Sequence, residues 1–346
     1  MLYRGGNMHW FIFLAATALL NQTTIGKAEQ TPMEVVITTS AAPEFLQQAF
    51  LDFESHLTTN FDQSIKPILL INGESGSEET TLVGLRRGRI QISMVSIGAA
   101  ATTLPELSLL TLPYLFDNNE EADHVLDKHL FYPYKKLLEA RGLILLRWLD
   151  SGWSIIYGKK PIHNYIDIEN YRFRSPSTIT SRIFFQHMGA DVITLPFSDV
   201  IPGLQTGLVN SGTTSTAMYL LTGIYSHAPF LTLTNHALNP GVLLANKKWF
   251  EGLSDHNKNI VSGGFASSEN LRSQSRLHSN AALQKLSTLS VEIIKQSKEE
   301  RKTWRLLSQE TKTRLIELLG GDARDLYDMA LTGICEFSKL NNLSDS

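Results

Sequence analysis

Tyr171-Arg172-Phe173-Arg174-Ser175-Pro176-Ser177 decides the fold prediction, because a short strand gives way here directly to a helix. Ser177 is predicted to cap a helix that runs through Met188. A strand at 192–195 follows, and then a helix that is capped by Ser198 and stops at Gly207. This half of the chain therefore alternates strand and helix.

The same alternation fills the residues before position 150. Strands are predicted at 33–38, 66–71, 90–95 and 143–148, and helical stretches at 45–57, 78–87 and 120–141. Strands joined through helices by short connections imply a parallel sheet that is covered on both faces.

Beyond position 238 the pattern changes. An Asn239-Pro240 turn is predicted before a strand at 241–246, and no proline occurs in the 106 residues after Pro240. That region is rich in residues that favour helices, so long helices are permitted there.

The resulting fold class is α/β: a hinged clamshell of two domains, each a mostly parallel sheet flanked by helices, with a long helical C-terminal region. Domain I is assigned to 29–151 plus about 240–280, and domain II to 152–239 plus about 281–333. Residues 334–346 are assigned to a C-terminal tail.

The N-terminus resembles a cleavable secretory signal over residues 1–28. Arg4 precedes an eleven-residue apolar run, 10–20, which is shorter than a membrane span, and Gly26-Lys27-Ala28 offers a cleavage site. A buried N-terminal helix is the alternative. Cleavage would change the net charge from −3 to −5 by removing Arg4 and Lys27. A mildly acidic chain without a basic cluster is a poor partner for nucleic acid, and no stable membrane insertion is expected.

No catalytic or metal-binding set emerges from the sequence, and no cofactor is expected. Phosphate-binding glycine loops and the nucleophile elbow are missing, and Cys335 is the only cysteine. His124 and His129 are five residues apart, so on an α-helix they would not share a face and are interpreted as solvated side chains.

Arg174 is the strongest candidate for ligand contact. Ligands bind at the carboxyl ends of strands in open α/β sheets, and a guanidinium there can bind a carboxylate through two parallel hydrogen bonds. A surface arginine in a weak ion pair is the alternative reading.

Six segments, in unbroken order, resemble the DctP-type solute receptors of tripartite ATP-independent periplasmic (TRAP) transporters. The similarity covers nearly all of residues 33–320, and its landmarks are 78–92, 105–116, 168–176, 187–210, 232–236 and 249–253. The resemblance implies a periplasmic receptor that closes on a small organic acid and delivers it to the membrane subunits of the transporter. It also implies that Arg174 clamps the ligand carboxylate, that Phe197 lines the cleft, and that Glu78 and Ser96 face the ligand.

Two departures from the family pattern concern the pocket. Thr213 and Thr214 stand where many members carry Glu and Asn, and Gly152-Trp153-Ser154 lacks the second arginine of members that bind sugar acids. A hydroxyl cannot replace a guanidinium. A ligand with one acidic group and a less polar remainder is therefore expected, with Trp153 either stacking against it or lying in the core.

Two other functions remain open from the sequence. One is a secreted hydrolase or lyase on a similar scaffold, and the other is a receptor that presents its ligand to a sensor rather than to a permease.

Overall fold

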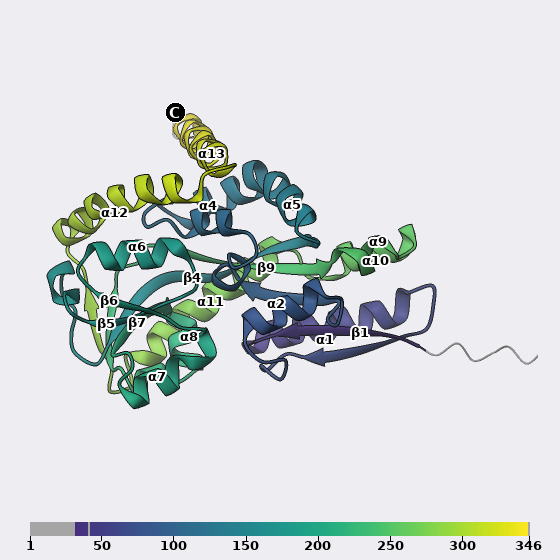
Figure 1. The fold of residues 1–346 in the computed structure, drawn as a ribbon, viewed down its shortest axis with the longest axis horizontal. Coiled ribbons are helices and arrows are strands. Elements are labelled where there is room, and N and C mark those ends of the chain that lie inside the picture. Colours follow the sequence, from purple (N-terminus) through teal and green to yellow (C-terminus); the bar gives the residue numbers. More distant parts are fainter. Residues whose placement is uncertain (1–31, 41, 345–346) are drawn as a thin grey trace, which may run out of the picture. The chain divides into compact units, whose positions relative to one another are not determined.

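The computed structural model describes residues 32–40 and 42–344, so the predicted signal peptide lies outside the described residues. Within them, ten strands form a continuous sheet in the order β2-β1-β3-β9-β4-β7-β5-β6, with β8 paired to β4 and β10 paired to β8 (Figure 1). The strands are β1 (Met33–Thr39), β2 (Ile65–Leu70), β3 (Ile92–Ser96), β4 (Leu143–Gly158), β5 (Arg172–Ser175), β6 (Asp191–Thr194), β7 (Ser211–Ser215), β8 (Phe230–Leu233), β9 (Leu238–Asn246) and β10 (Glu292–Lys295).

Two parallel groups of strands are joined by long antiparallel ones. β1 pairs in parallel with β2 and β3, β5 with β6 and β7, and β8 with β10. β4 pairs antiparallel with β9 over its first part and with β7 and β8 over its last part. Between them the register shifts after Asp150, and Gly152 has a φ of 87°. The predicted α/β class is therefore confirmed, with β4 shared by both parts of the sheet.

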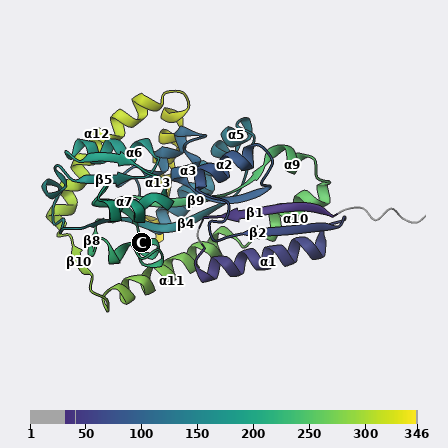
Figure 2. The ribbon, with the colours of Figure 1, turned by 60° about the horizontal axis from the view of Figure 1, so that its bottom comes forward.

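Helices cover both faces of each part, as Figures 1 and 2 show. On the part around β1, α1 and α10 lie on one face and α2, α3 and α5 on the other; on the part around β5, α7 and α8 oppose α6 and α12. The α-helices are α1 (Glu44–Asn60), α2 (Glu78–Arg86), α3 (Ile97–Ala100), α4 (Asn119–His124), α5 (Phe131–Ala140), α6 (Ile179–His187), α7 (Val200–Thr206), α8 (Thr216–Leu221), α9 (Lys247–Glu251), α10 (Asp255–Gly264), α11 (Ser268–Leu286), α12 (Lys298–Leu319) and α13 (Ala323–Ser344). Short 3₁₀ turns are η1 (Pro105–Thr111), η3 (Tyr165–Ile168), η4 (Phe197–Asp199) and η5 (Ile224–Ser226).

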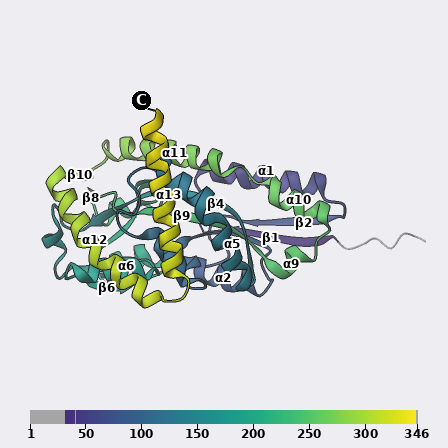
Figure 3. The same cartoon turned by 90° about the horizontal axis from the view of Figure 1, so that it is seen from above.

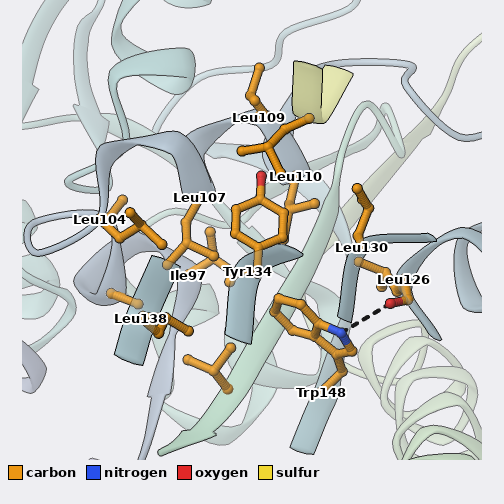
Figure 4. Packing of buried hydrophobic residues seen from close by; sticks show 14 of the residues in the cluster. Ile97, Leu104, Leu107, Leu109, Leu110, Leu126, Leu130, Tyr134, Leu138 and Trp148 are labelled. Atoms are coloured by element: carbon orange, nitrogen blue, oxygen red, sulfur yellow. Dashed lines mark hydrogen bonds between the residues drawn. The ribbon is translucent and has the colours of Figure 1, made fainter. Parts of the chain in front are cut away.

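Apolar side chains fill the space between these layers. In the largest cluster, Tyr134 of α5 and Trp148 of β4 meet edge to face with ring centroids 5.9 Å apart (Figure 4). The Trp148 indole N–H donates to the Leu126 carbonyl at 3.1 Å, so this buried polar group is satisfied. α11 contributes Leu271 to one cluster and Leu286 to another, and it links the two parts of the sheet along one side (Figure 3).

The helical stretch predicted at 120–141 is present, but its centre is a π-helical turn, η2 (Val125–Leu130). A π-helix brings residues five apart onto one face. The prediction that His124 and His129 point apart as solvated side chains is therefore wrong: their rings lie 5.4 Å apart and each side chain is less than one-fifth exposed.

Several local predictions also need correction. Asn239 and Pro240 lie within β9 rather than in a turn, with Pro240 opposite Asp150. Thr178 and Asp199, not Ser177 and Ser198, occupy the N-cap positions of α6 and α7, and neither cap side chain makes a capping bond. The long C-terminal helices are confirmed, although β10 interrupts them and α13 occupies most of the predicted tail. Among the described helices, none is both long and apolar enough to cross a membrane.

Candidate functional site

The main pocket lies at the carboxyl ends of β3, β5 and β7, where Ser96, Arg174 and Thr214 line it. α2 contributes Glu78, and η4 contributes Phe197. Six of the residues singled out from the sequence thus line one pocket: Arg174, Phe197, Thr213, Thr214, Glu78 and Ser96. Parallel strands end at a common edge, and the loops that follow them form the usual ligand site of such sheets.

Arg174 is held in the pocket wall by backbone carbonyls. Its Nε and Nη2 donate to the Leu195 carbonyl at 3.1 and 2.9 Å, and its Nη1 donates to the Thr213 carbonyl at 3.4 Å. The guanidinium carbon lies 5.7 Å from the centre of the Phe197 ring, within range of a cation–π contact. The side chain is therefore fixed in place before any ligand arrives.

The guanidinium of Arg174 has no ion-pair partner among the described residues, although the charges of Glu78 and Glu79 act on it from further away. The residue is only 4% exposed, and no described carboxylate forms an ion pair with it. Burial lowers the pKa of its guanidinium from the ordinary value, although an arginine stays protonated at neutral pH. Three of the five guanidinium N–H groups are used in the bonds above, which leaves two for a ligand. A buried, unpaired cation with free donors is a site for an anion.

Gly212 makes room for this arrangement. A Cβ added there would lie 3.1 Å from the Arg174 Cβ and 2.6 Å from the Tyr157 Cζ. Tyr157 is fully buried on β4, and burial raises the pKa of its hydroxyl to about 12. Glycine at this position therefore lets the tyrosine ring pack beside the arginine.

The two threonines of β7 have different roles. Thr213 is 5% exposed, and its hydroxyl donates to the Ile155 carbonyl at 2.9 Å, so its polar group is already satisfied. Thr214 is half-buried, and its hydroxyl makes no hydrogen bond with the described residues. Of the two, Thr214 is the one with a hydroxyl available to a ligand.

Glu78 and Ser96 hold the opposite wall together. The Glu78 carboxylate accepts from the Ser96 backbone N–H and from the Ser40 hydroxyl, each at 3.1 Å, and also from the Ser96 hydroxyl. Burial raises the pKa of Glu78 above its ordinary value, against these hydrogen bonds. Their observed role is to join the ends of β1 and β3 to the first turn of α2.

Trp153 is not among the residues that line this pocket. Its ring packs against the largest core cluster, and its indole N–H donates to the Asn119 side chain at 2.8 Å. Trp153 is thus partly buried against the core, which is closer to the second of the two interpretations offered by the sequence.

Sequence reasoning missed several pocket residues because they are distant in the chain. Glu79 accepts from the Ser177 hydroxyl at 2.9 Å, a bond that joins α2 to the loop after β5. Asp150, at the register shift of β4, is 8% exposed, accepts from the Gly152 N–H and faces Arg276 of α11. Burial raises its pKa. Only the Ser-Pro-Ser turn at 175–177 gave a local signal for any of these contacts.

His236 is a further pocket residue that the sequence did not single out. It is 3% exposed, stacks near Phe184 and shares a 2.7 Å hydrogen bond with the Thr234 hydroxyl. Burial lowers its pKa from 6.5 to about 3, so the ring is neutral in the folded protein at neutral pH.

Acidification is expected to destabilise the protein through His236. Its folded-state pKa lies below the unfolded value, so the unfolded chain takes up the proton first, and the stabilisation present above pH 6.5 is lost as pH falls towards 3. Between pH 7 and 5 the loss is about 2 kcal/mol. Urea unfolding at both pH values should show His236→Asn losing about 2 kcal/mol less than wild type. Replacing the exposed His163 in the same way is the control, and equal losses in all three proteins would refute the assignment.

Comparison with known proteins gives a consistent result. The profile of a family described as bacterial extracellular solute-binding protein, family 7 (DctP) matches residues 38–317. The 2,3-diketo-L-gulonate-binding periplasmic protein YiaO of Escherichia coli is 28% identical over 180 residues, 52% of this chain and 55% of YiaO. The ectoine-binding periplasmic protein TeaA of Halomonas elongata is 23% identical over 80% of this chain and 82% of TeaA.

The fold also matches solved structures. The sugar acid binding protein DctPAm of Advenella mimigardefordensis, in complex with galactonate, superposes with a TM-score of 0.81. It is 28% identical, and the match covers 87% of this chain and 99% of DctPAm. The residues matched by the family profile, 38–317, include all the residues that line the pocket.

Proposed function

From the premise that this chain belongs to the bacterial extracellular solute-binding protein family 7, we propose that it is the periplasmic receptor of a TRAP transporter. It binds a small organic acid in the pocket between the two parts of its sheet and delivers it to the membrane subunits. The observation that carries this proposal is Arg174, a buried cation with two free N–H groups and no carboxylate partner among the described residues.

The ligand carboxylate binds Arg174 in this proposal. The carbonyls of Leu195 and Thr213 hold the guanidinium from behind, and the Phe197 ring covers its face. The free N–H groups can then meet both oxygens of a carboxylate, the geometry in which arginine binds most strongly. Thr214 supplies a hydroxyl for a neutral polar group of the ligand.

A ligand with one carboxylate fits the charges of the pocket. Among its lining residues in the described chain, Arg174 is the one arginine or lysine, whereas Glu78, Glu79 and Asp150 are acidic. A second ligand carboxylate would be buried near these acids without a cation, which is costly. The pocket can therefore accept a ligand whose remaining part is neutral or positively charged.

Closure of the pocket follows from the way the two parts of the sheet are joined. We place the hinge at Gly152, where β4 passes between them, and the two predicted domains move about it. In this proposal the Ser177–Glu79 hydrogen bond, which joins α2 to the loop after β5, helps to hold the pocket closed, and Gly98 of α3 lies beside Pro176 of the same loop.

A panel of acids tests the proposed ligand class. Galactonate and 2,3-diketo-L-gulonate carry one carboxylate, ectoine carries one together with a positive charge, and succinate carries two. By calorimetry, at least one of the acids with a single carboxylate is expected to bind at least tenfold more tightly than succinate. The same acid is expected to raise the melting temperature of the protein. Tighter binding of succinate would overturn the single-carboxylate assignment, and no binding by any acid would count against the receptor function.

Three further observations test the rest of the proposal. A bound acid recovered chemically unchanged after long incubation argues for a receptor over a hydrolase or lyase, whereas conversion would reverse that choice. The mass of the exported protein locates the proposed signal cleavage after Ala28. Neighbouring genes for one small and one large membrane subunit point to a permease rather than to a sensor.

A further inference from the structure

A second group of polar side chains lies away from the pocket, between η2 and α13. His124 immediately precedes the π-helical turn, His129 lies within it, and Glu336 faces both from α13. The Nε2 atoms of His124 and His129 are 3.5 and 3.3 Å from the two oxygens of the Glu336 carboxylate, and one ligand atom of each residue lies within 4.8 Å of the others.

The two imidazole nitrogens are buried without a satisfactory hydrogen bond. Both Nε2 atoms are shielded from solvent, and neither has a hydrogen-bond partner within the described part of the chain. Glu336 is within ion-pair distance of both but bonds neither in good geometry. Buried polar atoms are normally paired, so two such nitrogens directed at one carboxylate are arranged to bind a ligand together with it.

The backbone around the cluster lets the two histidines and Glu336 lie close together. The π-helical turn places residues five apart on one face, and π-helical turns are frequent at functional sites. Trp148 donates to the Leu126 carbonyl within that turn and ties it to β4 (Figure 4). On α13, a Cβ added to Gly333 would lie 2.7 Å from the His129 Cδ2, so glycine lets the helix approach the imidazole.

We propose that His124, His129 and Glu336 bind a divalent transition-metal ion, with Zn²⁺ as the fitting example. Two imidazole nitrogens and one carboxylate oxygen are a ligand set that Zn²⁺ uses, with bonds of about 2.0–2.2 Å and a fourth position open to water. Tetrahedral bonds of that length place neighbouring ligand atoms about 3.3 Å apart, close to the two His–Glu separations. Glu336 is half-exposed, so the fourth position faces solvent.

The bound ion joins α13 to the helix that precedes β4. α13 packs on η2, and Phe337 of α13 lies against His124 with ring centroids 5.7 Å apart. The adjoining residues of that helix, Asp123 and Asp127, pair with Arg272 of α11. A metal ion at the cluster therefore holds the C-terminal helix against the body of the protein without touching the ligand pocket.

The test uses the full chain without a polyhistidine tag, dialysed against a chelator and titrated with ZnCl₂ by calorimetry. One Zn²⁺ is expected to bind per chain and to raise the melting temperature, while Mg²⁺, which prefers oxygen ligands, does neither. His129→Gln and Glu336→Gln are each expected to raise the Kd for Zn²⁺ at least about 100-fold. Co²⁺ bound in the same site should give the visible absorption bands of tetrahedral cobalt, and these bands should disappear in both variants.

The chain supplies a matched control. His187 and Glu310 form an ordinary histidine–glutamate pair, 3.2 Å apart, between α6 and α12, and no second histidine of the described chain joins them in a metal-binding group. His187→Gln is expected to leave Zn²⁺ affinity unchanged. The proposal is overturned if the wild-type protein binds no Zn²⁺ at micromolar concentration, or if His187→Gln weakens binding as much as His129→Gln does. The first of these outcomes is measured on the wild-type protein alone, so it does not depend on whether a variant folds.

Discussion

Arg174→Met is expected to raise the Kd for the best-binding acid of the panel by roughly a hundred- to several-thousand-fold. The ligand carboxylate would then be buried without its cation, and removing one partner of a buried charge pair costs about 3–5 kcal/mol. Each 1.4 kcal/mol corresponds to a factor of ten in Kd. Calorimetry with the purified variant measures the change directly.

Two further variants make the Arg174 result specific. Arg174→Lys keeps the positive charge but loses the planar pair of donors, so its affinity should fall between those of wild type and Arg174→Met. Arg172 lies two residues earlier on β5, is exposed, and donates to the Gly207 carbonyl. Arg172→Met should therefore bind as wild type does. Wild-type affinity in Arg174→Met would remove Arg174 from the site and with it the main support for an acid ligand.

The alternation of strand and helix was readable because it is a local property. Strand and helix positions on either side of Arg174 follow from apolar spacing and from Gly207, whose left-handed φ of 72° ends α7 as predicted. The same holds for Gly88, with a φ of 76°, after α2. These signals need only a few neighbouring residues, so they survive without tertiary information.

Contacts between distant residues were not readable in the same way. Ser177 has the composition of a helix cap, yet its hydroxyl bonds to Glu79, 98 residues away, because the pocket brings α2 to that turn. Pro240 was predicted in a turn but lies in β9, where it faces Asp150 at the irregular part of the β4 ladder. Proline is tolerated there because the register shift interrupts regular pairing.

The histidine pair shows how one assumption about helix type changes a functional conclusion. Spacing of five residues excludes a shared face only on an α-helix, and the sequence between His124 and His129 gives no local sign of a π-helix. Gly333, which makes room for His129, is more than 200 residues away. Six of the seven residues predicted to contact the ligand line one pocket, and their contact with a ligand stays a prediction.

Gly212→Ala is expected to lower the free energy of unfolding by about 3 kcal/mol and to weaken acid binding at least tenfold. The new methyl group would overlap the Tyr157 ring, because its carbon would lie 2.6 Å from the Tyr157 Cζ, and the Tyr157 side chain is fully buried. Overpacking of this kind typically costs about 1–3 kcal/mol. The same methyl group would lie 3.1 Å from the Arg174 Cβ, so the guanidinium is displaced from its carbonyl partners. Urea unfolding and calorimetry measure the two effects separately.

Gly263→Ala is the matched control, because it makes the same chemical change where no atom lies within 4 Å of the added Cβ. Gly263 is in α10, where alanine favours the helix, so this variant should be more stable than wild type by up to about 1 kcal/mol. Adding Tyr157→Phe to Gly212→Ala removes the hydroxyl that the methyl group would meet first, and should restore part of the stability and of the binding. We expect the free energy of unfolding to fall in Gly212→Ala and to rise in Gly263→Ala, with partial recovery in the double variant. This result would tie the lost affinity to the packing of Tyr157 against Arg174. A Gly212→Ala protein with wild-type stability and affinity would show instead that β4 and β7 can separate enough to admit a side chain, and that Arg174 does not depend on them for its position.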